Sequence, residues 1–314
     1  MRLVFMGSAD FAVPSLKALC AKGHEILLVV TQPDRPQGRG RKLKGTPVKE
    51  LAQQLGLPLA QPERVRDERF IESLRALQPE VIVVVAYGQI LPAAVLEIPA
   101  RGCINVHASL LPRYRGAAPV AWAIMQGEQE TGVTTMLMDE GMDTGDILLQ
   151  ARLLIPPRAT AGEVEKCLAE EGAELLLATL ERWEKGEIRP VRQNAAEATY
   201  APLLRAEHER IDWSQPALVI YNLVRALNPR PGAHTYFGDR LVKVWQAEVT
   251  DCDSKGMSPG EVLKLDGEGL VVQTGKGCLR LLEVQPAGRP RMSAAAFGRG
   301  YGVKPGVLLG ETKG

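Results

Sequence analysis

Short apolar runs alternate with stretches of helical periodicity along the first part of the chain. The patterns predict strands over residues 2–6, 25–31 and 81–86, and helices over residues 11–20, 47–55 and 67–77. The run 81–86 is apolar on both faces, as a central parallel strand requires. The alternation therefore predicts a doubly wound, Rossmann-like α/β domain with a parallel sheet, whose ligands bind beyond the carboxyl ends of the strands.

Two further strands, at 131–139 and 147–155, are predicted on either side of an acidic, glycine-rich loop at 139–146. A capping box at Thr160 and Glu163 then starts a long amphipathic helix that ends near Gly186. Residues 189–205 have no clear periodicity, which is typical of a linker. We therefore expect a first domain over residues 1–188, a linker over 189–205 and a second domain over 206–314.

The second domain has a different pattern of apolar and polar residues. After one helix near residues 220–227, short apolar runs are separated by glycine turns, a pattern that predicts a small OB-like β-barrel. Its basic residues outnumber the acids, because only Glu283 opposes them between residues 276 and 304. A solvated barrel surface and a nucleic-acid face are equally consistent with this excess. The basic residues are Lys276, Arg280, Arg289, Arg291, Arg299 and Lys304.

Composition narrows the class of protein. The chain has 314 residues and a formal net charge of +1, so any nucleic-acid surface must be local. Its five cysteines are widely spread and its histidines number four, so neither a disulfide framework nor a metal site is expected. No secretory signal or membrane-spanning run is evident, which favours a reduced cytoplasm.

Two common nucleotide-binding motifs are missing. The turn after the first strand, Gly7-Ser8-Ala9-Asp10-Phe11, lacks the second and third glycines that bring backbone close to a pyrophosphate. The segment 38–45 is rich in bases but does not end in Gly-Lys-Ser/Thr. Dinucleotide binding and phosphoryl transfer are therefore not expected.

The strongest candidate for catalysis lies where a short apolar strand meets a polar segment. Asn105 and His107 are two residues apart, so both side chains point to one face of an extended strand. The acidic loop offers a carboxylate partner for the imidazole, and we select Asp143. On spacing alone, a capping pair and an ordinary acidic turn remain alternative interpretations.

A second polar stretch, residues 31–44, is strongly basic. Five bases oppose one acid from Asp34 to Lys44, and proline and glycine interrupt them. This composition predicts a mobile cationic loop on the active-site side of the sheet, and contact with a polyanion is favoured over a merely solvated loop.

The catalytic segment resembles the folate-dependent formyltransferase family. The resemblance rests on Asn105-x-His107, on the run from Ser109 to Gly116, and on an aspartate at position 143. It implies that Asn105, His107 and Asp143 are catalytic and that 10-formyltetrahydrofolate is a co-substrate, with no tightly bound cofactor and no metal. The residues implied to line the folate pocket are Tyr87, Gly88, Ile90, Leu91, Ser109, Leu110, Leu111, Pro112 and Asp139.

The resemblance extends over nearly the whole chain, from Gly7-x-x-Asp10-Phe11 to Lys243-Val244-Trp245. The cationic insert and the second domain are similar to those family members that formylate the α-amine of methionyl initiator tRNA for translation initiation. This implies tRNA contacts from Arg39, Arg41, Lys42 and Lys44. The single barrel and single folate site are compatible with a monomer. A sister enzyme acting on a small amine, or a tRNA-binding protein without catalysis, are the alternatives.

Overall fold

The protein forms two compact units, and the computed structural model describes residues 1–37, 42–252 and 256–310. The first unit contains Met1–Pro119, Glu130–Leu154 and Glu165–Pro202; the second contains Val120–Gln129, Ile155–Val164 and Leu203–Gly314. The segment expected as a linker thus belongs to the first unit as far as Pro202. Among the described residues, no helix combines the length and apolar character needed to cross a membrane.

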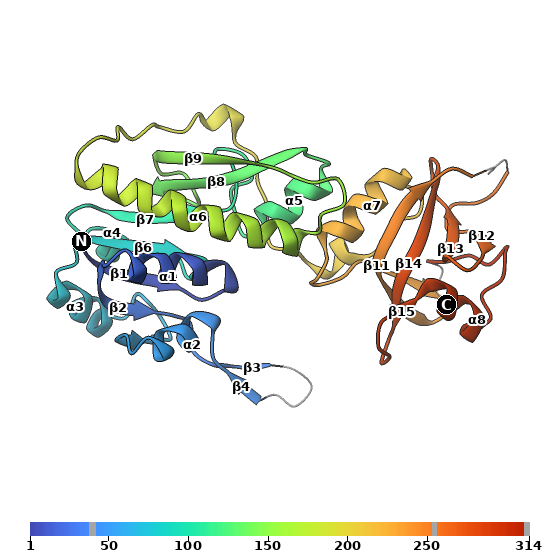
Figure 1. The fold of residues 1–314 in the computed structure, drawn as a ribbon, viewed down its shortest axis with the longest axis horizontal. Helices are drawn as coiled ribbons and strands as arrows, with labels where there is room; N and C mark the ends of the chain where they lie inside the picture. Colours follow the sequence, from blue (N-terminus) through green and yellow to red (C-terminus); the bar gives the residue numbers. More distant parts are fainter. Residues whose placement is uncertain (38–41, 253–255, 311–314) are drawn as a thin grey trace. The chain divides into compact units, whose positions relative to one another are not determined.

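A seven-stranded sheet forms the centre of the first unit, in the order β5-β2-β1-β6-β7-β8-β9 (Figure 1). The first five strands in this order are parallel, whereas β8 runs antiparallel to both β7 and β9. The strands are β1 (Arg2–Gly7), β2 (Glu25–Val30), β5 (Leu59–Ala60), β6 (Val81–Val85), β7 (Cys103–His107), β8 (Glu130–Leu137) and β9 (Ile147–Leu154).

Helices cover both faces of this sheet. Ile71 and Leu74 of α3 pack with Val4 and Ile82 on one face, whereas Gly172 of α6 lies against Val106 of β7 on the other. Thr46 and Asp67 start α2 and α3 by accepting hydrogen bonds from backbone N–H groups of the first turn. The helices are α1 (Val13–Ala21), α2 (Pro47–Gln54), α3 (Glu68–Leu77), α4 (Ala93–Leu96) and α6 (Ala161–Glu184), with short 3₁₀ turns η1 (Asp10–Ala12) and η2 (Ala195–Glu197).

The strand order reverses direction between β1 and β6, which creates the crevice where open α/β sheets bind ligands. The two strand ends are joined there by a hydrogen bond from the Ser8 hydroxyl to the Tyr87 carbonyl, at 2.9 Å. β7 lies next to β6, so the strand with Asn105 and His107 ends beside this crevice.

The second unit contains a curled antiparallel sheet, a half-barrel, in the order β10-β11-β14-β13-β12 with β15 paired to β14. The fold class predicted from the sequence is confirmed for both units. The elements are α5 (Pro119–Met125), η3 (Ala206–Glu209), α7 (Ala217–Ala226), β10 (His234–Phe237), β11 (Arg240–Thr250), β12 (Val262–Leu265), β13 (Leu270–Gln273), β14 (Cys278–Pro286), β15 (Met292–Ser293) and α8 (Ala294–Tyr301).

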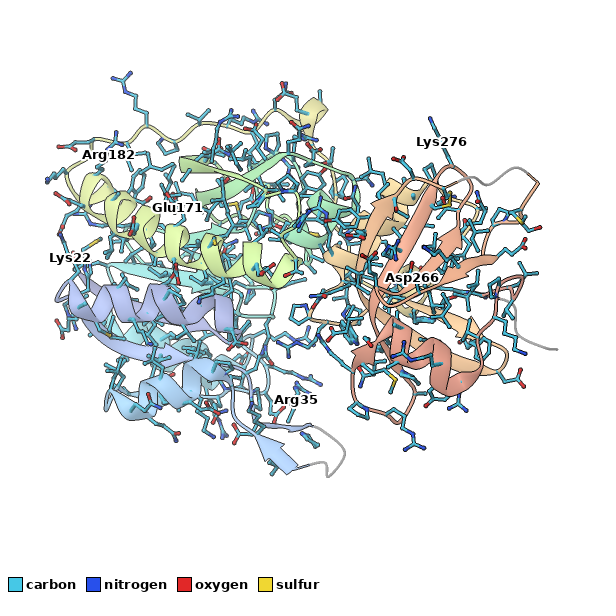
Figure 2. All side chains as sticks on the ribbon, turned by 45° about the vertical axis from the view of Figure 1, so that its right-hand side comes forward. Lys22, Arg35, Glu171, Arg182, Asp266 and Lys276 are labelled. Carbon is cyan, nitrogen blue, oxygen red and sulfur yellow. A yellow bond between two sulfur atoms is a disulfide. The ribbon has the colours of Figure 1, made fainter. Side chains whose placement is uncertain are left out.

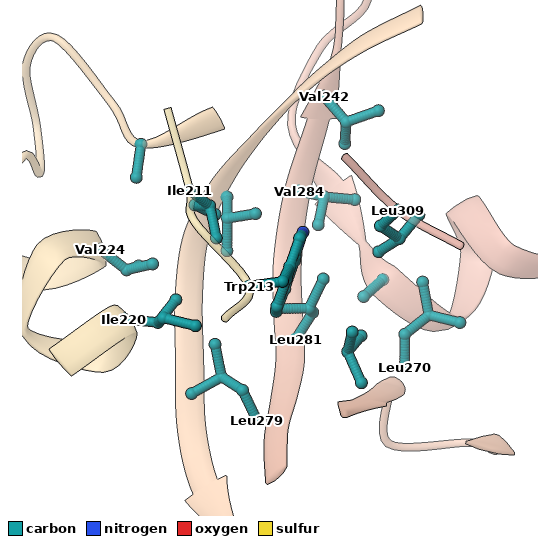
Figure 3. Close-up of a cluster of buried hydrophobic side chains, with 14 of the residues drawn as sticks. Ile211, Trp213, Ile220, Val224, Val242, Leu270, Leu279, Leu281, Val284 and Leu309 are labelled. Atoms are coloured by element: carbon teal, nitrogen blue, oxygen red, sulfur yellow. The ribbon is translucent and has the colours of Figure 1, made fainter. Parts of the chain in front are cut away.

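Apolar side chains fill the half-barrel (Figure 3). Trp213 is 4% exposed, and its indole N–H donates to the Thr235 hydroxyl at 2.9 Å. Leu279 and Leu281 on β14 contribute to the same cluster, as does Ile220 on α7. Buried side chains from the strands and from α7 therefore give this unit its own core.

Two expectations need correction. The cationic stretch was expected to be a loop, but its flanks pair as the antiparallel strands β3 (Arg35–Gln37) and β4 (Lys42–Lys44), because Arg35 and Lys44 align in register. No disulfide framework was expected, yet Cys252 and Cys278 form a disulfide. No local spacing marks this pair, because folding brings together cysteines that are 26 residues apart.

Candidate active site

Asn105 and His107 lie on the same face of β7, as the spacing predicts. Cys103, two residues before Asn105, packs with α3 and α4, so this face is opposite to the one that α6 covers at Val106. His107 is buried, with 7% of its side chain exposed, and Asn105 is half-buried. Within the described residues the Asn105 amide has no side-chain hydrogen bond, so its N–H groups are available to a substrate.

The two ring nitrogens of His107 have different neighbours. Nε2 lies 3.0 Å from the carbonyl oxygen of Tyr114, which can only accept, so Nε2 carries the proton of this hydrogen bond. Nδ1 lies 3.7 Å from Asp143 Oδ2, a distance too long for a hydrogen bond. Nδ1 is therefore the nitrogen that can exchange a proton with a ligand or the carboxylate.

Asp143 is held in an unusual backbone conformation. Its φ is +54°, in the left-handed region that non-glycine residues adopt uncommonly, aspartate and asparagine more often than most. Oδ2 accepts a hydrogen bond from the Gly116 N–H at 2.8 Å, and the carboxylate is only 16% exposed. The structure thus brings Asp143 and His107 together over 36 positions of sequence and aims the carboxylate at the imidazole.

The loop that contains Asp143 is stiffened from inside. Asp139 Oδ1 accepts hydrogen bonds from the Gly141 N–H at 3.0 Å and the Thr144 hydroxyl at 2.7 Å. At Gly145 a side chain is excluded, because a Cβ would collide with the Leu137 carbonyl oxygen. Asp139, predicted to contact folate, therefore supports the loop through its side chain.

The turn after His107 is held by side chains from the neighbouring strands β8 and β9. Thr134 on β8 donates its hydroxyl to the Ser109 carbonyl at 2.6 Å and accepts from the Leu111 N–H at 3.2 Å. Gln150 on β9 donates to the Leu111 carbonyl at 2.9 Å. The antiparallel strands β8 and β9 therefore fix the backbone of the segment 109–112, which the sequence assigned to the folate pocket.

The other predicted folate segment, residues 87–91, follows β6. The Tyr87 ring is buried in the core, with 2% exposure, and burial raises the pKa of Tyr87 to about 12. Gly88 has a φ of +88° and Ile90 is 85% exposed, whereas Leu91 is buried. This segment can thus offer backbone groups and the Ile90 side chain to a ligand, but not the Tyr87 ring.

Ser8 and Gln32, which the sequence analysis did not select, hold this segment in place. Both side chains donate to the Tyr87 carbonyl, at 2.9 and 3.3 Å, and the Gln32 N–H donates to the Ser8 hydroxyl at 3.1 Å. Gln32 lies within residues 31–44, the stretch that the sequence marked as strongly basic. Its position just after β2, near the carboxyl edge of the sheet, is the feature of the sequence that could have marked Gln32 as part of the site.

The β3–β4 hairpin is anchored at its base. Asp34 accepts hydrogen bonds from Gln61 at 2.7 Å and from Lys49 at 2.6 Å, and both bonds lower the pKa of Asp34. Arg35 and Lys44 pair at the base of the two strands, and both are exposed; Figure 2 labels Arg35. Of the predicted tRNA contacts, Lys42 lies on β4, whereas Arg39 and Arg41 lie outside the described residues.

The basic residues of the second unit are not equivalent. Arg280 is 12% exposed and pairs with Asp266, Glu248 and Glu268, at 2.8–3.4 Å. Arg291 lies over the Trp245 ring, 3.8 Å from its centroid, and reaches Glu283 at 3.5 Å. Of the six basic residues noted in the sequence between 276 and 304, the other four are exposed: Lys276, Arg289, Arg299 and Lys304.

A resident metal has no evident place in the described residues. No group of three or more His, Cys, Asp or Glu side chains there has the arrangement to bind a metal ion. The site offers an amide, an imidazole and a carboxylate on a rigid scaffold, a set suited to acyl transfer with proton transfer.

Two domain models of known protein families match this chain. The model described as formyl transferase matches residues 1–180, and the one described as formyl transferase, C-terminal domain, matches residues 203–302. The methionyl-tRNA formyltransferase of Moorella thermoacetica is 54% identical over 310 residues, which are 99% of each chain. The protein of the same name from Pelotomaculum thermopropionicum is 50% identical, again over 99% of each chain.

Solved structures share the fold. HypX from Aquifex aeolicus, in complex with tetrahydrofolic acid, superposes with a TM-score of 0.65 at 22% identity; the match covers 95% of this chain but only 47% of HypX. An N-formyltransferase from Helicobacter canadensis, in complex with folinic acid and dTDP-3-aminofucose, has a TM-score of 0.63 at 18% identity and covers 89% of this chain and 98% of that one. With both domain models matched and a relative 54% identical over its full length, this chain belongs to the formyltransferase family.

Proposed function

We propose that this protein transfers the formyl group of 10-formyltetrahydrofolate to the α-amine of methionyl initiator tRNA, giving N-formylmethionyl-tRNA for translation initiation. The observation that carries the proposal is the geometry at the end of β7, where Asp143 faces His107 Nδ1 beside the free amide of Asn105. The identity of 54% to a methionyl-tRNA formyltransferase over 99% of both chains supports the choice of acceptor.

The chemistry follows from the residue types. The methionyl amine attacks the formyl carbon, and the carbonyl oxygen gains negative charge as the carbon becomes tetrahedral. The Asn105 amide and the protonated His107 ring donate hydrogen bonds to that oxygen, and each donor of this kind contributes about 3–4 kcal/mol to the transition state. Collapse of the intermediate expels the folate nitrogen, which takes up a proton.

Asp143 has two tasks in this mechanism. Its carboxylate stabilises the positive charge of the His107 ring across 3.7 Å, and it accepts the proton of the attacking amine directly or through a water molecule. The hydrogen bond from the Gly116 N–H keeps Oδ2 aimed at the ring throughout. Neither task requires a metal ion.

The folate would lie along the two fixed segments, residues 87–91 and 109–112, with Asp139 and its loop as a third wall. Their backbone groups are held by Ser8, Gln32, Thr134 and Gln150. A preformed backbone surface binds a flat heterocycle with little loss of conformational entropy. Folate acts here as a co-substrate that leaves after each turnover.

The tRNA would be bound by charges from both units. We expect Arg39, Arg41, Lys42 and Lys44 to meet the acceptor end, because this part of the sequence follows β2, whose carboxyl end lies at the ligand-binding edge of the sheet. Exposed bases of the half-barrel such as Lys276, Arg289, Arg299 and Lys304 supply phosphate contacts elsewhere on the tRNA. We assign the protein to the cytoplasm as a monomer.

One acceptor panel tests the proposal. The full chain is incubated with formyl-labelled 10-formyltetrahydrofolate and, in parallel, methionyl initiator tRNA, an amino-sugar nucleotide and glycinamide ribonucleotide, with His107→Asn as the control. Label on the methionyl amine of the initiator tRNA is expected. Label only on a small amine would identify the protein as a sister formyltransferase. Binding of tRNA without transfer of label would show that the protein binds tRNA but does not formylate it.

A further inference from the structure

The segment that the sequence presented as a linker lies directly behind the catalytic residues. Thr199 accepts from the Tyr114 N–H through its hydroxyl at 2.8 Å and from the Arg115 N–H through its carbonyl at 2.9 Å. The Ala201 N–H donates to the Arg115 carbonyl at 2.7 Å. The Tyr114 carbonyl accepts the His107 Nε2 proton, so the segment 193–201 determines where that acceptor stands.

Gln193, at the start of this segment, holds the Asp143 side of the site. Its amide N–H groups donate to the carbonyls of Asp143 and Gly145, at 2.8 and 2.7 Å. Its oxygen accepts from Arg115 Nε and Nη2, at 3.1 and 2.7 Å. Both donors and both lone pairs of this buried amide are thereby used.

Arg115 is an unusual partner for this amide. Its side chain is 5% exposed, and within the described residues it pairs with Gln193 rather than with a carboxylate. A buried guanidinium demands hydrogen-bond acceptors, so it fixes the Gln193 amide with its oxygen toward Arg115 and its N–H groups toward the loop. The positive charge of Arg115 thus determines the orientation of the Gln193 amide.

The loop needs this support because its backbone is strained. Asp143 has a φ of +54°, and such conformations persist only where the surroundings hold them. Gln193 fixes the carbonyls on both sides of Thr144, and with them the direction of the Asp143 carboxylate. His107 therefore has two neighbours whose positions depend on this segment. Thr199 positions the Tyr114 carbonyl, and Gln193 positions Asp143.

We propose that Gln193 and Thr199 are positioning residues, which hold the two groups that orient His107 without contacting the reacting atoms. This inference rests on the proposed function for its kinetic consequence. Its structural consequence is independent of any substrate, because it concerns only the surroundings of the imidazole.

Gln193→Glu is the decisive variant. A glutamate retains the acceptor for Arg115 but presents oxygens to the carbonyls of Asp143 and Gly145 in place of donors. We expect kcat to fall 10- to 100-fold, with KM for folate and tRNA within threefold of the wild type. Asn194→Ala is the matched control, since Asn194 is exposed and only caps η2, and it should leave kcat within twofold.

Substitutions of Thr199 give a second test, which leaves the buried pair of Arg115 and Gln193 intact. Thr199→Val removes the acceptor for the Tyr114 N–H while keeping the shape, and a several-fold loss of kcat is expected. Thr199→Ser retains the hydroxyl and should restore the rate. Equal rates for Val and Ser at this position would contradict the positioning role of Thr199.

The imidazole itself reports the outcome without substrate. The chain has four histidines, so ¹⁵N-histidine NMR resolves few signals, and His107→Asn identifies that of His107. We expect the ring ¹⁵N shifts of His107 to change in Gln193→Glu and not in Asn194→Ala. Unchanged shifts and a kcat within twofold of the wild type in folded Gln193→Glu would overturn the inference. A wild-type protein that formylates no tRNA, yet shows the shift change, would overturn the proposed function alone.

Discussion

The end of β7 and the interior of the half-barrel are built from opposite kinds of side chain. Around His107, buried polar side chains such as Ser109, Thr134 and Gln193 donate hydrogen bonds to backbone carbonyls of the surrounding loops. The half-barrel core is a cluster of aliphatic residues around Trp213. A substitution near His107 is therefore expected to change the orientation and spacing of the catalytic groups, and with them the rate of the reaction. A substitution in the half-barrel should change mainly the free energy of unfolding.

The largest effect is expected at the catalytic residues. Asn105→Ala and Asp143→Ala should each lower kcat about 100-fold or more, because each removes a group that stabilises charge formed only in the transition state. The unfolding temperature should change little. Glu140→Gln, an exposed change in the same loop as Asp143, is the control. A folded Asp143→Ala enzyme with near-normal kcat would remove the carboxylate from the mechanism.

The half-barrel should respond in the opposite way. Leu281 is 1% exposed, and Leu281→Ala should lower the free energy of unfolding by about 2–5 kcal/mol through lost burial and a residual cavity. At 25 °C and saturating tRNA, kcat should remain close to that of the wild type. Urea unfolding followed by tryptophan fluorescence measures the loss, with the exposed Leu218→Ala as the control. An unchanged unfolding curve would contradict the assignment of Leu281 to this core.

A smaller effect separates the two kinds of tRNA contact in the hairpin. Arg39 stands between two glycines, which allow close approach to a groove, and its guanidinium can donate two parallel hydrogen bonds. Arg39→Ala should reduce tRNA formylation and narrow the preference for initiator over elongator methionyl-tRNA. Lys44→Ala should weaken both tRNAs alike and reduce the salt dependence. Formylation of both tRNAs across a salt series distinguishes these outcomes, and unchanged discrimination in Arg39→Ala would exclude that role.

The smallest effect is a pH-dependent one in the half-barrel. Hydrogen bonds from Lys264 and Arg280 hold the pKa of Asp266 far below its usual range. A carboxyl whose pKa is lower in the folded state stabilises the protein above its unfolded pKa of about 3.9, and this contribution is lost as the pH falls. Asp266→Asn should therefore lower the unfolding temperature at pH 6 and less so toward pH 3. The exposed Asp239→Asn serves as the control, and a difference that does not vary with pH would contradict the ion pair.

The sequence predicted the parts of the fold that have local signals. Strand and helix positions followed from apolar periodicity, and the proximity of His107 to Asp143 followed from a motif. The antiparallel pairing of β8 with β9 is indicated by their connection, which is too short for a parallel crossover, but no local signal shows that β8 runs antiparallel to β7. The catalytic and ligand-binding roles of the predicted residues remain predictions.

Gln193 shows why part of the site was missed. Its partners Asp143 and Gly145 lie 50 and 48 residues away, and the contact is made by a neutral amide to backbone carbonyls. Neither charge nor periodicity marks such a residue in a sequence. The same holds for Ser8 and Thr134, whose hydroxyls act on carbonyls of distant turns.

Single-turnover formylation by His107→Ala tests the central claim most directly. With saturating 10-formyltetrahydrofolate and methionyl initiator tRNA, rapid quenching gives the rate of the chemical step, and titration gives the Kd of each substrate. The account predicts a rate at least about 100-fold below the wild type with both Kd values nearly unchanged. A near-normal rate in the folded variant would show that the imidazole at the end of β7 does not perform the chemistry.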